Sequence, residues 1–220
     1  MKVGTDGVLL GAWAALRRDD LRLLDVGTGT GVIALMLAQR QPAAQITALD
    51  IDPACIVQAR ANADGSAWSG RVHTVCRPVQ EFAAAEPFDL VISNPPYYDR
   101  SLLPPDAGRT TARHTVTLSY GELIAAACRL LAADGRLAVI LPAAESQRFR
   151  AQAAGRLALC RLTEVWSTPR SGVKRCLMEF RRRAETSEPK PDIGRLVIEE
   201  APGCFTEEYR CLTRDFYLKF

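Results

Sequence analysis

Short apolar runs of strand length alternate with segments of helical spacing through the first two thirds of the chain, and no other feature limits the fold as strongly. The runs are rich in Val, Ile and Leu and occupy residues 21–26, 45–50, 72–76, 88–93 and 136–141. Continuous apolar runs of this length are typical of strands buried on both faces of a sheet. The alternation therefore predicts an α/β fold with a doubly wound, mostly parallel, Rossmann-like sheet and helices on both faces.

Two local signals mark where the predicted helices begin. Pro53 suits the first turn of a helix, where its missing N–H breaks no hydrogen bond. Ser119 and Glu122 stand in a capping-box pattern, which is typical of a helix start. We expect helices over residues 31–40, 53–63, 119–133, 144–154 and 206–217.

The last third of the chain has a different pattern. Residues 160–168 and 175–181 predict two strands joined by a basic turn with glycine, so an antiparallel hairpin should complete a seven-stranded sheet. Residues 181–192 are charged and contain proline, which predicts a surface loop. With 220 residues, of which 48% are hydrophobic, the chain suits a single domain over 1–220.

Composition limits the compartment and the kinds of site. No run of about 18 apolar residues occurs, and the first residues lack the charged and then apolar layout of a signal peptide. We therefore expect a cytoplasmic protein without a membrane partner. The seven cysteines form no C-x-x-C pair and only two histidines are present, so we expect neither a disulfide framework nor a metal site. We expect a monomer.

A glycine-rich turn directly follows the first predicted strand. Its residues are Asp25, Val26, Gly27, Thr28, Gly29, Thr30 and Gly31. The glycines allow a tight turn and a close approach to a ligand, and the next helix offers free N–H groups. Asp50 ends the second predicted strand, where a carboxylate can accept hydrogen bonds from both hydroxyls of a ribose. Val32 breaks the dinucleotide fingerprint and no G-K-[ST] follows, so the turn predicts a nucleoside cofactor site.

A second motif, Asn94-Pro95-Pro96-Tyr97, ends the strand predicted at 88–93. Ligands of parallel α/β sheets bind beyond the carboxyl ends of the strands, so both motifs should face one cleft. The amine of a purine is a poor nucleophile because its lone pair is delocalised into the ring. The Asn94 side-chain oxygen and the Pro95 carbonyl would accept hydrogen bonds from the two N–H groups of the amine, which would free that lone pair. Tyr97 offers an aromatic face on which the base can stack.

The glycine spacing resembles motif I of the class I methyltransferases, which bind S-adenosylmethionine, and N-P-P-Y resembles the motif of the members that methylate amino groups. Three segments narrow the resemblance: KVGTDGVLLGAWA (2–14), SNPPYY (93–98) and EEYRCLTRDFYL (207–218). Over nearly its whole length the chain resembles the bacterial tRNA(1)(Val) (adenine(37)-N6)-methyltransferase family. The resemblance implies S-adenosylmethionine as cofactor, S-adenosylhomocysteine as product, tRNA as partner, and methylation of an adenine N6 amine, that of adenosine 37 in a valine tRNA.

The resemblance also implies roles for residues of the cofactor site. The N-terminal segment lies over the cofactor in this family, which makes Thr5, Asp6 and Gly7 its neighbours, although Asp6 is equally suited to cap a helix. Members usually carry residues before this segment, so part of the cofactor cover is expected to be absent. Many relatives carry an acid for the cofactor adenine near Pro78, and here that contact falls to the backbone or to Gln80. The candidate cofactor-binding residues are Thr5, Asp6, Gly7, Asp25, Gly27, Thr28, Gly29, Gly31, Asp50, Ile51, Gln80 and Asn94, and the candidate catalytic residues are Asn94, Pro95, Pro96 and Tyr97.

Candidate RNA contacts come from two parts of the chain. The connection between Tyr98 and Ser119 is too long for an ordinary loop, which indicates a functional or disordered segment. The turn 169–175 and the arginines at 181–183 form the densest basic cluster of the sequence and are expected on the tRNA backbone. The candidate residues are Tyr98, Arg109, Arg113, His114, Arg170, Lys174 and Arg175.

Two other functions remain open from the residues. The side-chain amide of a protein glutamine poses the same delocalisation problem, so N5-methylation of a release factor or ribosomal protein is an alternative to tRNA. A catalytically silent module that binds S-adenosylmethionine or RNA is the other alternative, although the intact motifs argue against it. Asn94→Ala separates catalysis from binding, because it should abolish methyl transfer and leave cofactor binding largely in place.

Overall fold

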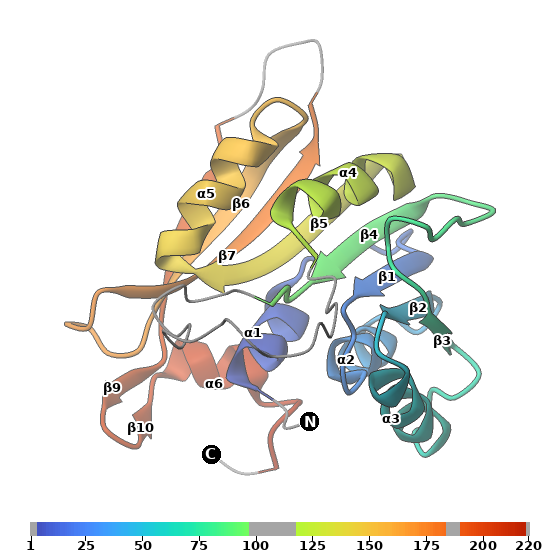
Figure 1. Ribbon diagram of the computed structural model, residues 1–220. Helices are drawn as coiled ribbons and strands as arrows, with labels where there is room; N and C mark the ends of the chain where they lie inside the picture. The colour runs from blue at the N-terminus through green and yellow to red at the C-terminus, as the bar shows by residue number, and fades with distance from the viewer. Residues whose placement is uncertain (1–3, 97–117, 184–189, 219–220) are drawn as a thin grey trace, which may run out of the picture.

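The computed structural model describes residues 4–96, 118–183 and 190–218. Its centre is an eight-stranded sheet in the order β3-β2-β1-β4-β5-β7-β6-β8, with helices on both faces (Figure 1). The first five strands pair in parallel: β1 (Arg22–Val26), β2 (Gln45–Asp50), β3 (Val72–Cys76), β4 (Phe88–Ser93) and β5 (Leu131–Pro142). The doubly wound, mostly parallel α/β sheet predicted from the sequence is confirmed.

Successive side chains of the central strands point to opposite faces and build two cores. In β1, Leu23 packs into the core of one face and Leu24 into that of the other, and both are fully buried. The first face carries α1 (Thr5–Trp13), α2 (Val32–Arg40), α3 (Pro53–Asp64) and α6 (Glu207–Thr213), and the second carries α4 (Tyr120–Leu130) and α5 (Ala143–Ala153). Burial on both sides requires apolar residues at consecutive positions, which explains the continuous runs in the sequence.

The last strands turn the sheet antiparallel. β6 (Leu157–Trp166) and β7 (Val173–Arg182) form the predicted hairpin, and β7 inserts between β5 and β6. β8 (Asp192–Val197) pairs in parallel with β6 and adds an eighth strand to the seven that were predicted. Leu196 is the buried residue of β8, so this edge strand carries no apolar run that sequence reasoning could detect. Two short strands, β9 (Glu199–Ala201) and β10 (Cys204–Phe205), pair separately before α6.

The capping box predicted at the start of α4 is confirmed. Glu122 N donates to Ser119 Oγ at 3.2 Å, and Ser119 N donates to Glu122 Oε2 at 2.8 Å. The helix ends at Leu130 and not near residue 133, because Leu131 already pairs with Phe88 in the sheet. Tertiary pairing therefore sets the end of a helix whose start is set locally.

Arginine side chains fix the C-terminal end of α1. Arg40 Nη1 donates to the carbonyl oxygens of Gly11 and Ala14 at 2.6 and 2.8 Å. Arg161 Nη2 donates to the carbonyl of Trp13 at 2.9 Å, and its guanidinium lies 3.6 Å from the centroid of the Trp13 ring. The last carbonyls of a helix lack intrahelical donors, and the helix dipole favours cations there. These contacts hold the N-terminal helix against α2 and the sheet.

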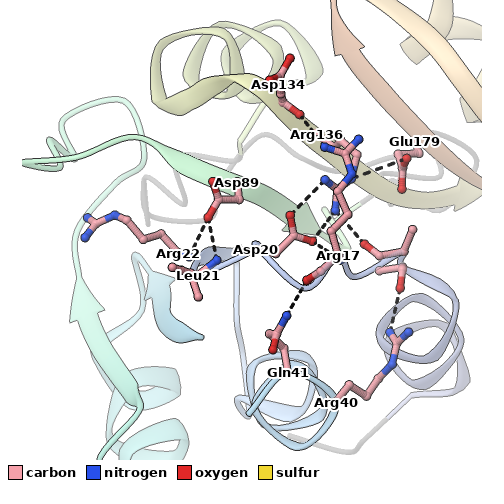
Figure 2. A network of polar contacts seen from close by, with 12 residues as sticks. Arg17, Asp20, Leu21, Arg22, Arg40, Gln41, Asp89, Asp134, Arg136 and Glu179 are labelled. Atoms are coloured by element: carbon pink, nitrogen blue, oxygen red, sulfur yellow. Dashed lines mark hydrogen bonds and ion pairs between the residues drawn. The ribbon is translucent and has the colours of Figure 1, made fainter. Parts of the chain in front are cut away.

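A buried ion pair ties the connection between α1 and β1 to the middle of the sheet (Figure 2). Arg136 of β5 is 1% exposed, and its Nη2 and Nη1 lie 2.6 and 3.1 Å from the carboxylate oxygens of Asp20. Arg136 Nε lies 3.7 Å from Glu179 Oε1 on β7. Asp20 Oδ2 also accepts a hydrogen bond from Arg17 N at 2.6 Å. The pair joins side chains that are 116 positions apart in the sequence.

Candidate active site

The two sequence motifs meet because their strands are neighbours. Val26, the last residue of β1, pairs with Ser93, the last residue of β4. Ser93 Oγ donates to the Val26 carbonyl at 2.8 Å, and both groups are buried. The glycine turn that follows β1 and Asn94, which follows β4, therefore leave the sheet at the same edge and side by side.

The glycine turn has a backbone that other residues rarely adopt. Gly27, Gly29 and Gly31 have φ angles of 73°, 55° and 80°, in the left-handed region that favours glycine. Gly27 N donates to the carbonyl of Leu49 in β2 at 2.8 Å. The turn is also held by Asp50, because Asp50 Oδ2 accepts a hydrogen bond from Gly29 N at 2.9 Å. The glycine turn and Asp50, which the sequence predicts to share one site, are thus in direct contact.

Asp25 supports the turn from below and is not exposed to the cleft. Its side chain is fully buried, and burial raises its pKa to about 7 against the opposing effect of a hydrogen bond from Thr28. Thr28 Oγ1 donates to Asp25 Oδ2 at 2.6 Å, whereas Asp25 Oδ1 has no hydrogen-bond partner among the described residues. Asp25 and Thr28 therefore act on the shape of the turn.

A cavity of about 430 Å³ lies between the two motifs, within the size range of small-molecule sites. Of the residues predicted for the site, Gly27, Gly29, Asp50, Ile51, Gln80, Asn94, Pro95 and Pro96 line it. Sequence reasoning did not identify Cys55, Arg77, Val79 and Leu118 as further lining residues. Arg77 and Val79 follow β3, so the rule that ligands bind beyond the strand ends would have found them.

Gln80 lines the cavity beside the capping box of α4. Hydrogen bonding by Ser119, and after it the nearby Gln80 side chain, holds the pKa of Glu122 below its usual value. A carboxylate only accepts hydrogen bonds, so Glu122 favours the Gln80 amide nitrogen as its neighbour and leaves the amide oxygen available as an acceptor. The carboxylate of the capping box therefore lies next to one wall of the cavity.

The cavity fits an adenosyl cofactor on three observations. Each carboxylate oxygen of Asp50 accepts one backbone N–H, from Gly29 and from Asp52, and retains a lone pair for a ribose hydroxyl. A Cβ at Gly27 would meet no protein atom within 4 Å, so the glycine leaves open space at the cavity wall. Ile51 and Val79 supply apolar wall on which a flat ring can pack.

The predicted residues of the N-terminal segment do not line the cavity. Asp6 Oδ2 accepts a hydrogen bond from Arg175 Nε at 2.8 Å, and Gly7 packs against Val32 at the start of α2. The N-cap of α1 is Gly4, with no side-chain cap, so the expectation that Asp6 caps a helix is wrong. Asp6 and Arg175, predicted for the cofactor and for RNA, are partners of each other. Thr5 lines a different cavity.

The basic cluster seen in the sequence is divided by the fold. Arg170 and Lys174 are exposed in and after the turn before β7, at the edge of the sheet that carries the cavity. Arg181, Arg182 and Arg183 lie at the other end of β7, about 30 Å away at roughly 3.4 Å per residue. The expectation of one basic surface is therefore wrong, because an extended strand separates the two groups. The predicted contacts Tyr97, Tyr98, Arg109, Arg113 and His114 lie outside the described residues.

Neither a cluster of metal ligands nor a membrane-spanning helix occurs in the described ranges. Within 4–96, 118–183 and 190–218, no three His, Cys, Asp or Glu side chains are arranged to hold a metal ion. No helix of these ranges is long and apolar enough to cross a membrane.

Comparison with known sequences gives matches over most of the chain. The family model of the methyltransferase small domain matches residues 8–150. The chain is 43% identical to the tRNA1(Val) (adenine(37)-N6)-methyltransferase of Flavobacterium johnsoniae, over 100% of this chain and 93% of the relative. It is 43% identical to the Porphyromonas gingivalis protein of that name, over 99% and 89%. The Trichodesmium erythraeum protein is 40% identical, over 100% and 92%.

Comparison with solved structures confirms the methyltransferase fold. A protein described as a predicted O-methyltransferase from Agrobacterium tumefaciens superimposes with a TM-score of 0.73 at 20% identity, over 96% of both chains. A ribosomal protein L11 methylase from Lactobacillus delbrueckii has a TM-score of 0.57 at 18% identity, over 81% of this chain and 77% of that one. At these identities the likeness concerns the fold alone.

Proposed function

The chain belongs to the methyltransferase small domain family and to the tRNA1(Val) (adenine(37)-N6)-methyltransferases, and from this membership we propose that it methylates the N6 amine of an adenine in tRNA. The methyl donor is S-adenosylmethionine and the target is adenosine 37 of a valine tRNA. The observation that carries the proposal is the shared cavity, because Asn94 and Pro95 line the same space as Gly27 and Asp50.

The cavity residues divide the work of holding the cofactor. Asp50 would accept hydrogen bonds from the ribose hydroxyls, and Gly27 and Gly29 would let the chain approach the methionine end closely. Gln80, which lies beside Glu122, would accept a hydrogen bond from the adenine amine. When bound, S-adenosylmethionine supplies a methyl group on a positively charged sulfur.

Asn94 and Pro95 prepare the amine of the target base. The Asn94 oxygen and the Pro95 carbonyl are two acceptors for the two N–H bonds of the amine, and accepting both draws the nitrogen toward a pyramidal shape. Pro95 is buried and Asn94 is half-buried, so the acceptors stand in a partly desolvated, preorganised site. Neither Pro95 nor Pro96 has an N–H that would repel the amine. The amine proton becomes acidic only once nitrogen carries the methyl group, so no strong base is required.

The RNA is held by the edge of the sheet that carries the cavity. Arg170 and Lys174 are exposed there and contact phosphates. Tyr97 stacks on the target base, and Tyr98, Arg109, Arg113 and His114 contact the RNA around it. The enzyme acts as a monomer in the cytoplasm.

Labelled S-adenosylmethionine tests the proposal directly. The protein is incubated with bulk tRNA, ribosomal RNA and a release factor, and labelled nucleosides are identified by mass spectrometry. We expect label in tRNA, as N6-methyladenosine. Label confined to the release factor would replace the proposal with glutamine methylation, and a protein that binds the cofactor but labels nothing would be a silent module.

The variant Asn94→Ala tests the role of the cavity in the reaction. It removes one of the two acceptors and leaves Gly27 and Asp50 intact, so transfer to tRNA should be lost while the cofactor Kd changes little. Equal loss of cofactor binding and transfer would contradict the role assigned to Asn94.

A further inference from the structure

Two segments that carry the resemblance take no direct part in the proposed methyl transfer, and the fold brings them together. Thr5 belongs to the N-terminal segment 2–14, and Tyr209 and Tyr217 belong to the C-terminal segment 207–218. They line a second cavity of about 460 Å³, here named the aromatic cavity. Its lining residues are Thr5, Ser167, Ile198, Glu199, Phe205, Tyr209 and Tyr217.

The aromatic cavity opens at the same edge of the sheet as the active site. Ser167 follows β6 and Ile198 follows β8, and both strands run parallel to β4 and β5. The strand order places β6 three steps and β8 four steps from β4. At about 4.8 Å per strand, the aromatic cavity therefore lies about 14 to 19 Å along this edge from the end of β4, where Asn94 stands.

The walls of the aromatic cavity suit a flat ring with polar edges. The Phe205 and Tyr209 rings lie 5.3 Å apart, and the Tyr209 and Tyr217 hydroxyl groups are 3.3 Å apart. Tyr209 is buried, whereas Phe205 and Tyr217 are half-buried. Bases of single-stranded RNA stack on such aromatic side chains.

One acidic group in the cavity selects for a donor. Glu199 is half-buried, and its carboxylate accepts no hydrogen bond from the described residues. A carboxylate accepts hydrogen bonds and has none to donate. An N–H group on the edge of a base, either an exocyclic amine or a ring N–H, would satisfy it.

Basic side chains follow closely after Ser167, a lining residue of the aromatic cavity. The turn that begins after Ser167 holds the exposed Arg170, and the exposed Lys174 follows as the second residue of β7. Arg195 is also exposed, its guanidinium lies 4.2 Å from the centroid of the Trp166 ring, and its Nη2 donates to the Pro169 carbonyl at 3.1 Å. Cations around an aromatic slot favour a ligand with phosphates outside and a ring inside.

We propose that the aromatic cavity binds a second base of the RNA substrate, which stacks on its rings and donates an N–H to Glu199, while the target adenine occupies the site at Asn94. This inference rests on the proposed function. The separation of about 14 to 19 Å corresponds to about four to six stacked nucleotides at 3.4 Å each, and to fewer of an extended strand. The two cavities therefore hold bases from different places in one loop, and the second base fixes the register of the first.

Binding of an anticodon-arm stem-loop RNA tests this inference. Ser167→Phe fills the cavity from an exposed position, and Thr5→Phe fills it from the other wall. Ala201→Phe is the matched control, because it adds the same ring at an exposed position of β9 outside the cavity lining. Each protein is titrated with stem-loops that carry one abasic nucleotide at each loop position except the target, and circular dichroism and the cofactor Kd report the fold.

We expect that removing the base at one loop position weakens RNA binding only when the aromatic cavity is open. Stacking is worth about 1–3 kcal/mol per base, so one abasic position should weaken binding to the unaltered protein by about 5- to 150-fold. The same abasic position should have no further effect in Ser167→Phe or Thr5→Phe. The control should behave like the unaltered protein.

Two results would overturn the inference, and they separate it from the proposed function. If the unaltered protein methylates tRNA but the cavity-filling variants bind every stem-loop as the control does, the aromatic cavity is not a base site and the proposed function stands. If the unaltered protein neither methylates nor binds tRNA, both fail. Loss of cofactor binding in one variant would mark it as misfolded, and the other variant then decides.

Discussion

Asp20→Ala should destabilise the protein by about 3–5 kcal/mol, because it leaves the guanidinium of Arg136 buried without its closest counter-charge. Arg136 is 1% and Asp20 2% exposed, so neither group regains water when the other is removed. The remaining carboxylate, Glu179, lies 3.7 Å from Arg136 Nε, compared with 2.6 Å for the pair that is lost. The loss includes the acceptor for Arg17 N at 2.6 Å.

Urea unfolding followed by circular dichroism measures the change in free energy, and thermal unfolding measures the shift in Tm. For a chain of this size, each kcal/mol lowers Tm by about 2–4 °C, so the expected shift is about 6–20 °C. Arg148→Ala is the matched control: it breaks a 2.8 Å ion pair with Glu145 in which the arginine side chain is 63% exposed. Because exposed pairs contribute little, the control should lose less than about 0.5 kcal/mol.

The losses of stability caused by changes at Asp20 and Arg136 should also be non-additive. Removing both charges with Asp20→Leu and Arg136→Met should cost less than the sum of the single changes, since no uncompensated charge remains between those two positions. A loss below about 1 kcal/mol for Asp20→Ala, or strict additivity of the two changes, would refute the claim that each charge of the pair offsets the cost of burying the other.

Three further predictions follow from the site. Gly31→Ala should cost more stability than Gly27→Ala, because a Cβ at Gly31 would lie 3.2 Å from Ala59 while one at Gly27 meets no atom within 4 Å. Gly27→Ala should instead weaken cofactor binding more, because Gly27 lines the cavity. Calorimetry of unfolding and of cofactor binding measures the two effects separately. Asp25→Asn should gain stability relative to the unaltered protein as pH rises, by about 2–3 kcal/mol more at pH 8 than at pH 5. The reason is that burial raises the Asp25 pKa to about 7, so the ionised form increasingly penalises the fold between its unfolded and folded pKa; a pH-independent difference in urea unfolding would contradict this. Glu122→Ala should raise the cofactor Kd more than Ser119→Ala, since both remove the capping box but only the former removes the carboxylate beside Gln80. Equal Kd values would show that Glu122 does not influence cofactor binding through Gln80.

The sequence by itself determined the central sheet and the two motifs at its edge. The runs at 21–26 and 88–93 are apolar at consecutive positions because both faces of their strands are covered. This requirement can be recognised from the local sequence of each run alone. The glycines of the turn and the two prolines after Asn94 are likewise local, because positive φ and missing N–H groups constrain single positions. Neighbouring parallel strands then bring the motifs together.

Tertiary structure decided the contacts between distant segments. The ion pair of Asp6 with Arg175 and that of Asp20 with Arg136 join side chains 169 and 116 positions apart, and no local pattern indicates either partner. The eighth strand is exposed over most of its length, so its pairing leaves no periodic signal. The basic residues of 169–183 look continuous in sequence, yet the extended β7 carries them to opposite edges of the sheet. The sequence indicates which positions must be buried, whereas only the packed structure shows which distant residue each of them contacts.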